Sequence, residues 1–350
     1  MSIECEIEFV RSYSDTVFLI RNELLEATVT AVNFSPQKVG VIMRIIFMGT
    51  PDFAANILKR IIDEQYEVVL VVSQPDRPVG RKKELRPTSV KQVALDHNIP
   101  VFQPEKIRTE YDEIIAANPD LIITAAYGQI VPKAVLDAPR LSCINVHASL
   151  LPKYRGGAPI HQAIIDGAPE TGVTIMYMDV GLDTGDMISQ RSTPITDDDD
   201  TGILFERLSQ LGADLLIATL PSIEAGTNDK TAQDESQVTY AYNITRKQEL
   251  INWDRSARVV FNHIRGLNPF PAAYTTINEQ NVKMFKAKII GGDSLNAGTI
   301  IAVSTIGIDV VCGDGMVLRI TELQLAGKKR MPIQDLLNGD HPFVVGAKFD

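Results

Sequence analysis

An asparagine and a histidine stand two residues apart at the end of a short apolar run, at Asn145 and His147. Alternate residues of an extended chain point to one face, so these two side chains project together. Asp183 lies in a second polar segment, between Gly181 and Gly185, and glycines there let the backbone turn sharply and approach a ligand. An amide and an imidazolium can donate to a developing oxyanion, and a nearby carboxylate favours the protonated imidazole. We expect these three side chains to be catalytic, although each alone has a structural alternative, a buried histidine or a turn residue.

Five apolar runs are the candidate strands of the domain that carries these residues. They cover 44–48, 68–72, 121–126, 143–146 and 173–178. Stretches with a helical pattern lie between them, at 53–62, 89–97, 106–117 and 158–166. Thr50 is expected to cap the first helix, with Pro51 in its first turn. The alternation predicts an α/β fold, a Rossmann-like open and mostly parallel sheet with helices on both faces. Ligands of such sheets bind at the carboxyl ends of the strands, where Asn145 and His147 are expected.

A change of composition after a helix-like stretch at 203–219 predicts a second domain. Residues 227–240 are polar with few apolar anchors, which is typical of an interdomain linker. A helix is expected at 256–266, and turns separate strand-like runs at 272–277, 282–290, 299–303, 307–312 and 316–325. We therefore predict a catalytic domain at 43–226, a linker at 227–240 and a small OB-like β-barrel domain at 241–350.

Residues 1–42 form an extension of unclear status, because their pattern differs from the rest and changes abruptly at Met43. The segment is either translated from an upstream start codon, with Met43 as the natural start, or a genuine appendage. The first interpretation is favoured, since the recognisable fold begins at Arg44.

Composition narrows the class of protein. The chain has 350 residues, of which 45% are hydrophobic, and this suits about two globular domains. It has no run of roughly 20 apolar residues that could span a bilayer and no signal peptide. Cys5, Cys143 and Cys312 lie far apart without the spacing of metal ligands, so we expect reduced thiols, no metal and a cytoplasmic protein. No obligate protein partner is evident.

A basic segment interrupts an otherwise acidic chain, whose net charge is −10. Its cationic residues are Arg77, Arg81, Lys82, Lys83, Arg86 and Lys91, and Glu84 is its one acid. Prolines and a glycine break the segment, so we expect a loop. A basic loop on an acidic protein suggests an interaction with phosphates, and a solvated face is the open alternative.

These motifs together resemble the family of 10-formyltetrahydrofolate-dependent formyltransferases, in its tRNA-specific branch. The match covers nearly everything from Met43 onward, and its strongest pieces are 49–54 (GTPDFA), 74–78 (QPDRP), 126–128, 144–159, 171–187 and 326–329. The resemblance implies that a formyl group passes from 10-formyltetrahydrofolate, a co-substrate, to the α-amine of methionyl initiator tRNA for translation initiation. It also implies a folate site lined by Ser149, Leu150, Leu151 and Pro152. We expect the acceptor arm of the tRNA to be bound by Arg77, Arg81, Lys82, Lys83 and Arg86.

Two other functions stay open at this point. The same three catalytic residues occur in relatives that formylate small amines, such as glycinamide ribonucleotide or an amino sugar. The basic segment and the C-terminal domain argue against a small acceptor, which needs neither. A protein that binds tRNA without catalysis is the other alternative, but it has no need of an aligned asparagine, histidine and aspartate.

Overall fold

The computed structural model describes residues 10–11, 16–17, 43–79 and 83–350. Two short strands, β1 (Val10–Arg11) and β2 (Thr16–Val17), pair with each other in a unit that ends at Val41. All other elements belong to a second compact unit, Ile42–Asp350. Most of the predicted extension 1–42 therefore lies outside the described residues.

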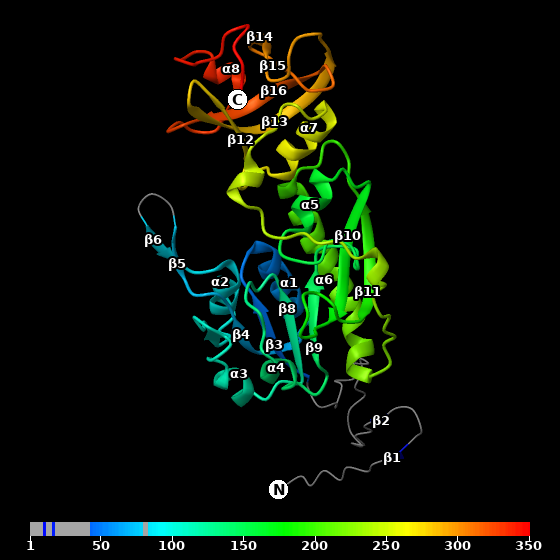
Figure 1. Ribbon diagram of the computed structural model, residues 1–350. Helices are drawn as coiled ribbons and strands as arrows, with labels where there is room; N and C mark the ends of the chain where they lie inside the picture. Colours follow the sequence, from blue (N-terminus) through cyan, green and yellow to red (C-terminus); the bar gives the residue numbers. More distant parts are fainter. Residues whose placement is uncertain (1–9, 12–15, 18–42, 80–82) are drawn as a thin grey trace, which may run out of the picture. The chain divides into compact units, whose positions relative to one another are not determined.

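The first domain is built on a seven-stranded sheet with the order β11-β10-β9-β8-β3-β4-β7 (Figure 1). Its strands are β3 (Arg44–Gly49), β4 (Glu67–Val72), β7 (Val101–Phe102), β8 (Leu121–Ala125), β9 (Cys143–His147), β10 (Glu170–Tyr177) and β11 (Met187–Pro194). The pairs from β7 to β9 are parallel, whereas β10 runs antiparallel to both β9 and β11. The predicted open, mostly parallel sheet is confirmed.

Helices cover both faces of this sheet, as predicted. They are α1 (Asp52–Asp63), α2 (Ser89–Asp96), α3 (Asp112–Ala116), α4 (Lys133–Leu136), α5 (Pro159–Ile165) and α6 (Thr201–Ala225). Alternate residues of β3 divide between two cores, because successive side chains of a strand point to opposite faces. Ile45 and Phe47 pack with α1, α2, α5 and α6, whereas Ile46 and Met48 pack with α3 and α4.

Two local predictions for this domain were wrong, and one strand was not predicted. Thr50 does not cap α1 with its side chain. Its hydroxyl instead donates to the Tyr127 carbonyl at 2.9 Å, and Pro51 takes the N-cap position. The helix expected at 106–117 is limited to α3, because Ile107 lies in a turn before it. The edge strand β11 was missed, since its MISQRSTP sequence is mostly polar and no residue in it is fully buried.

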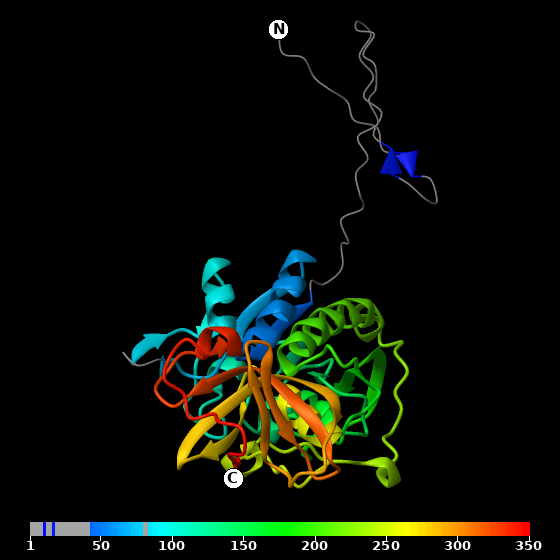
Figure 2. The same ribbon diagram turned by 90° about the horizontal axis from the view of Figure 1, so that it is seen from above.

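The second domain has its own hydrophobic core, formed between its helices and its sheet. It is drawn as the yellow to red segments of Figure 2. Its helices are α7 (Ala257–Gly266) and α8 (Ile333–Leu336). Its strands are β12 (Ala273–Ile277), β13 (Gln280–Gly292), β14 (Ile300–Ser304), β15 (Gly307–Val311), β16 (Met316–Leu325) and β17 (Met331–Pro332). They pair in the antiparallel order β12-β13-β16-β15-β14, with β17 on β16.

The C-terminal residues join the two edges of this antiparallel sheet. The Ile300 amide of β14 donates to the Ala347 carbonyl, and the Asp350 amide donates to the Thr276 carbonyl of β12. The sheet is thus closed into a small barrel, which agrees with the predicted OB-like domain.

The two domains meet where α5 and α7 pack together. Gly266 of α7 lies so near α5 that an added Cβ would stand 2.6 Å from the Ile165 side chain. The Thr201 hydroxyl at the start of α6 donates to the Gly266 carbonyl at 2.6 Å, and the Arg265 guanidinium reaches the Asp199 carbonyl at 2.9 Å. Among the described residues no helix is both long and apolar enough to cross a membrane.

Candidate active site

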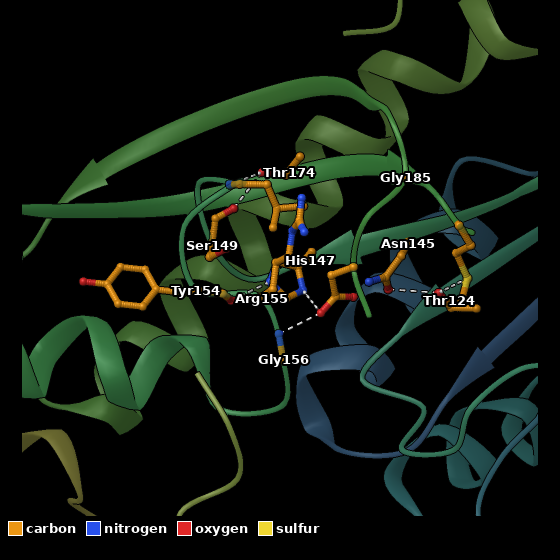
Figure 3. A network of polar contacts seen from close by, with 12 residues as sticks. Thr124, Asn145, His147, Ser149, Tyr154, Arg155, Gly156, Thr174 and Gly185 are labelled. Atoms are coloured by element: carbon orange, nitrogen blue, oxygen red, sulfur yellow. Dashed lines mark hydrogen bonds and ion pairs between the residues drawn. The ribbon is translucent and has the colours of Figure 1, made fainter. Parts of the chain in front are cut away.

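Asn145 and His147 lie at the carboxyl end of β9, which runs between β8 and β10 in the sheet. Figure 3 shows their side chains. Their strand neighbours are Thr124 on β8 and Met176 and Thr174 on β10. The two-residue spacing places both side chains on one face of the strand, as the sequence predicted.

The Asn145 amide is oriented by its neighbour on β8. The Thr124 hydroxyl donates to Asn145 Oδ1 at 2.9 Å. Thr124 is itself buried, with its hydroxyl 3.2 Å from the Ile144 carbonyl. With Oδ1 engaged in this way, the Asn145 NH2 group is the part of the amide left to donate into the adjoining pocket.

His147 is held between a carbonyl and a carboxylate, and only 5% of it is exposed. Its Nε2 lies 3.0 Å from the Tyr154 carbonyl, an acceptor, so Nε2 carries a proton. Its Nδ1 faces Asp183 Oδ2 at 3.7 Å, which is within range of an ion pair but longer than a hydrogen bond. A proton taken up by Nδ1 would therefore give an imidazolium with a carboxylate beside it.

The Asp183 loop is fixed in an uncommon backbone conformation. Asp183 has φ of 53°, in the left-handed region that costs a non-glycine residue roughly 1–2 kcal/mol. Gly185 is required next to it, because an added Cβ would stand 1.9 Å from the Tyr177 carbonyl oxygen. The Gly156 amide donates to Asp183 Oδ2 at 2.8 Å and so orients the carboxylate.

The Asp183 loop is also tied to the segment 227–243, here called the strap. Gln233 Nε2 donates to the carbonyls of Asp183 and Gly185, at 2.7 and 2.8 Å. Gln233 Oε1 accepts from Arg155 Nε at 3.0 Å, and Arg155, only 1% exposed, pairs with Glu235 at 2.8 Å. The segment 227–240, predicted as a linker, is therefore hydrogen-bonded across the site.

Asn145, His147 and Asp183 all line one pocket of about 480 Å³. This volume is within the range of small-molecule sites. The rest of the lining comes mainly from the turn after β8, from the start of α5 and from two aromatic side chains. These residues are Ala126, Tyr127, Gly128, Gln129, Ile130, Val131, Gly156, Gly157, Ala158, Pro159, Ile160, His161, Phe53 and Phe205.

Ser149, Leu150, Leu151 and Pro152 are not among the residues that line this pocket. Ser149 is fully buried, and its hydroxyl donates to the Lys153 carbonyl at 2.7 Å. The Thr174 hydroxyl donates to the Ser149 carbonyl at 2.7 Å, which ties this turn to β10. Their part in folate binding stays a prediction.

The turn after β8 was not assigned to the site from the sequence, although it carries a recognisable signal. Ala126 and Gly128 both have positive φ, 44° and 92°. A sharp turn directly after a buried parallel strand lies at the carboxyl edge of the sheet, where ligands bind.

A larger and more open hollow of about 780 Å³ lies elsewhere, between α1, α6 and β11. Its lining is largely charged, including Lys59, Arg60, Glu206, Arg207 and Asp214. None of the three expected catalytic residues borders it, so size alone does not locate the site.

The basic segment forms a hairpin, where the sequence had predicted a loop. Strands β5 (Arg77–Val79) and β6 (Glu84–Arg86) pair antiparallel as a separate two-stranded sheet that stands apart from the main one (Figures 1 and 2). Exposed ion pairs join Arg77 to Glu105 at 3.2 Å and Arg86 to Glu84 at 3.6 Å. Lys83 is exposed at the turn, whereas Arg81 and Lys82 lie outside the described residues.

Lys91 does not belong to this cationic group. It lies in α2, where its ammonium contacts Asp76 at 2.6 Å and Gln103 at 2.7 Å. Its charge is therefore neutralised locally, and fewer charges than expected remain for a partner.

Within the described residues no group of histidine, cysteine and acidic side chains could hold a metal ion. Cys143 and Cys312 are buried, and burial raises the pKa of each thiol to about 12.

Comparison with known proteins identifies the class to which this fold and site belong. The Formyl transferase family matches residues 43–220, and the Formyl transferase, C-terminal domain family matches residues 243–341. Solved structures agree in fold. HypX from Aquifex aeolicus with tetrahydrofolic acid has a TM-score of 0.61 at 17% identity, over 85% of this chain and 47% of that one. WlaRD, a sugar 3N-formyl transferase, has a TM-score of 0.61 at 21% identity, over 83% of this chain and all of that one.

Closer relatives by sequence define the branch. A methionyl-tRNA formyltransferase of Staphylococcus epidermidis is 53% identical over 305 residues, 87% of this chain and 98% of the relative. That of Lysinibacillus sphaericus is 55% identical over 300 residues, 84% of this chain and 95% of the relative. The chain belongs to the methionyl-tRNA formyltransferase family, and it is a formyl-transferring enzyme.

Proposed function

We propose that this enzyme transfers the formyl group of 10-formyltetrahydrofolate to the α-amine of methionyl initiator tRNA, in the cytoplasm, for translation initiation. The observation that carries the proposal is the convergence of the Asn145 amide, the His147 imidazole and the Asp183 carboxylate on one pocket of about 480 Å³. No strong base is needed to prepare the nucleophile, since free α-amines have a pKa of roughly 7.7–8.0 and a neutral fraction is present at pH 7.

The reaction forms one C–N bond and breaks another. The neutral amine attacks the formyl carbon, and the carbonyl electrons move onto oxygen to give a tetrahedral oxyanion. When the oxyanion collapses, the bond between the formyl carbon and N10 breaks. The proton lost by the amine replaces the formyl group on N10, so no net proton is released.

The three side chains have complementary parts in this sequence of steps. The Asn145 NH2 group and the Nδ1–H of a protonated His147 donate to the oxyanion, because Nε2–H is already engaged with the Tyr154 carbonyl. Such donors are worth roughly 10²–10³ in rate each. Asp183, whose Oδ2 lies 3.7 Å from His147 Nδ1, relays the proton between the amine and N10.

Support for the donor comes from the shape of the pocket and from two related folds. The turn after β8 gives the pocket an apolar wall with Tyr127, Ile130 and Val131, which suits a flat heterocycle. The structure of HypX is a complex with tetrahydrofolic acid, and that of WlaRD was determined in the presence of dTDP and 5-N-formyl-THF. We include Ser149, Leu150, Leu151 and Pro152 in the proposed folate site as supports of the turn next to His147.

Support for the acceptor comes from sequence identity more than from fold. WlaRD acts on a sugar and matches 83% of this chain, so the shared architecture does not separate the acceptors. Identities of 53–55% to methionyl-tRNA formyltransferases favour the tRNA. We also propose that the hairpin, through Arg77, Arg81, Lys82, Lys83 and Arg86, binds the acceptor arm.

One assay tests the function. The enzyme is given 10-formyltetrahydrofolate with methionyl initiator tRNA, methionyl elongator tRNA, glycinamide ribonucleotide or an amino sugar nucleotide, each alone, and kcat/KM is measured. The initiator tRNA is expected to be preferred over each other acceptor by at least about 10²-fold, the scale on which a site discriminates between related substrates. Comparable turnover of a small amine would refute the tRNA assignment. Equilibrium binding of tRNA and folate without turnover would refute catalysis.

A further inference from the structure

Two tyrosines on the strap expose their rings to solvent. Tyr240 is 49% exposed and Tyr242 is 64% exposed. Their rings are stacked, with centroids 5.5 Å apart and planes only 1° from parallel. Side chains two residues apart in an extended segment share a face, and this explains the pairing.

The backbone between the two rings is held firmly. Ala241 is completely buried, its amide donates to the Arg155 carbonyl at 2.7 Å, and its carbonyl accepts from the Ala158 amide at 2.9 Å. Gly156 passes so close that an added Cβ would stand 2.7 Å from the Ala241 carbonyl oxygen. The exposed rings therefore sit on a rigid support and are already ordered before any partner arrives.

This aromatic pair borders the catalytic pocket. Gly156, which packs against Ala241, also donates its amide to Asp183 Oδ2. Asn243, the residue after Tyr242, lines the pocket beside Gly157. A group stacked on the rings would thus be anchored next to the reacting centre, outside the pocket itself.

A cationic side chain, Lys153, precedes a residue that contacts the strap next to Tyr240. Lys153 is exposed, and its ammonium has no ion pair or hydrogen bond with the residues that the structure describes. The following residue, Tyr154, donates its amide to Thr239 Oγ1 at 2.8 Å, and Thr239 precedes Tyr240. Exposed parallel rings beside such a cation are the combination that binds a base and its phosphate.

We propose that Tyr240 and Tyr242 form a stacking platform for the terminal adenine of the acceptor tRNA, with Lys153 binding a phosphate of that end. The aminoacyl ester is carried by the ribose of this same nucleotide, so the platform positions the methionyl amine over Asn145, His147 and Asp183. The inference rests on the proposed function, because it assigns the subsite for that function's acceptor. The alternative is that the two rings only stabilise the strap by packing on each other.

A fluorescent base reads the platform directly. Uncharged initiator tRNA with 2-aminopurine in place of the terminal adenine is titrated with the enzyme, because stacking of this base on an aromatic ring quenches its fluorescence. Strong quenching is expected with the wild type and with Tyr242→Phe, which keeps the ring face. It is expected to disappear with Tyr242→Ala and with the double variant Tyr240→Leu, Tyr242→Leu, which keeps apolar bulk without a π face.

Turnover provides the second readout. Tyr242→Ala is expected to raise KM for methionyl initiator tRNA by about ten-fold, the lower part of the range for removal of a base stack, with kcat nearly unchanged. KM for 10-formyltetrahydrofolate and the Tm serve as checks on the fold. Phe270→Ala removes a ring that is 76% exposed and lies outside the strap, and it is the matched control with no expected change.

The outcomes separate the platform from the proposed function. Unchanged quenching and unchanged KM in Tyr242→Ala and in the double leucine variant would overturn the platform. A fall in Tm without loss of quenching would also overturn it, in favour of a packing role. The fluorescence measurement needs neither folate nor chemistry, so it gives an answer even if the wild type proves not to formylate methionyl tRNA.

Discussion

The strap and the hairpin are both polar segments, and the sequence predicts that both are loosely attached. In the structure they differ in how they contact the rest of the domain. The strap, 227–243, is bonded across the active site through Gln233, Glu235 and Ala241. The hairpin, β5 with β6, forms its own small sheet, and its ion pairs join side chains that are more than half exposed. Such exposed pairs contribute little to stability, typically about 0–1 kcal/mol.

This difference indicates that the two segments have different functions. The strap holds the backbone of the Asp183 loop in place, so it supports the catalytic residues, whose positions must be fixed. The hairpin forms a sheet of its own, and its cationic side chains are exposed, so they are accessible to a large, negatively charged partner. We expect strap variants that release the Asp183 loop, such as Gln233→Ala, to change kcat, and variants of the hairpin to change KM for tRNA and its salt dependence.

The largest effects are expected at the site that the strap supports. Asn145→Ala, His147→Ala and Asp183→Asn should each lower kcat by about 10²–10³-fold, because each removes a group that acts on the transition state. The double variants should lose far less than the product of the single losses, since the three groups act together. Single-turnover kinetics with saturating tRNA measure the chemical step.

Asn281→Ala, an exposed asparagine in the second domain, is the control for this series and should be silent. Near-full turnover of Asp183→Asn across the pH range would show that the carboxylate has no part in the chemistry.

The sequence predicted the parts of the fold and site that depend on local pattern. The short apolar runs of β3 and β8 are typical of buried parallel strands. The two-residue spacing of Asn145 and His147 predicts that their side chains share one face of a strand. The OB-like domain was recognised because short strands and turns alternate there.

The parts that were not predicted depend on interactions between distant residues. Gln233 reaches Asp183 and Gly185, which lie 50 and 48 positions away in sequence, and a polar segment carries no sign of such a partner. The position of Lys91 in the sequence groups it with the basic loop, and nothing in the sequence identifies Asp76 as its partner. The β5–β6 pairing was missed because prolines in the segment favour a loop.

An intermediate effect is expected at Gln233. Gln233→Ala leaves the carbonyls of Asp183 and Gly185 without their donor and Arg155 Nε without its acceptor, and unmet buried groups cost roughly 1–3 kcal/mol. Because the loss falls on the Asp183 loop, kcat should drop about ten-fold, the equivalent of ~1.4 kcal/mol, and KM for folate should hold. Steady-state kinetics with the donor varied give this split.

Gln237→Ala is the matched control, since Gln237 is an exposed glutamine of the same strap that bonds only locally to Asp234. A lower Tm for Gln233→Ala with unchanged kcat would reduce the strap to a structural tie and weaken the comparison with the hairpin.

A smaller effect is expected in the hairpin. Lys83→Ala with Arg86→Ala should weaken tRNA binding and lower the slope of log affinity against log salt by about 0.7–0.9 for each phosphate that is no longer neutralised. Folate binding and kcat at saturating tRNA should not change. Lys59→Ala, an exposed cation on α1, controls for net charge. If both variants give the same slope as the wild type, the hairpin is a solvated face.

The smallest effect is expected at Asp76, where the hairpin joins the rest of the domain. Asp76 precedes β5, and the hydrogen bond from Gln103, followed by that from Lys91, holds the pKa of its carboxyl below the usual value. A carboxyl with a lowered pKa stabilises the fold above its unfolded pKa of about 3.9, and this stabilisation is lost as pH falls through the lower folded value. Asp76→Asn should therefore lower the free energy of unfolding at pH 7 by about 0.5–1 kcal/mol, since the pair is only partly buried. The difference from the wild type, followed by urea unfolding from neutral pH into the acid range below the unfolded pKa, should shrink toward the acid end. Asp340→Asn, an exposed carboxylate, should show no such difference. If the difference in the free energy of unfolding stays constant into the acid range, Asp76 acts by packing and not by its charge. The attachment of the hairpin to the domain would then need another explanation.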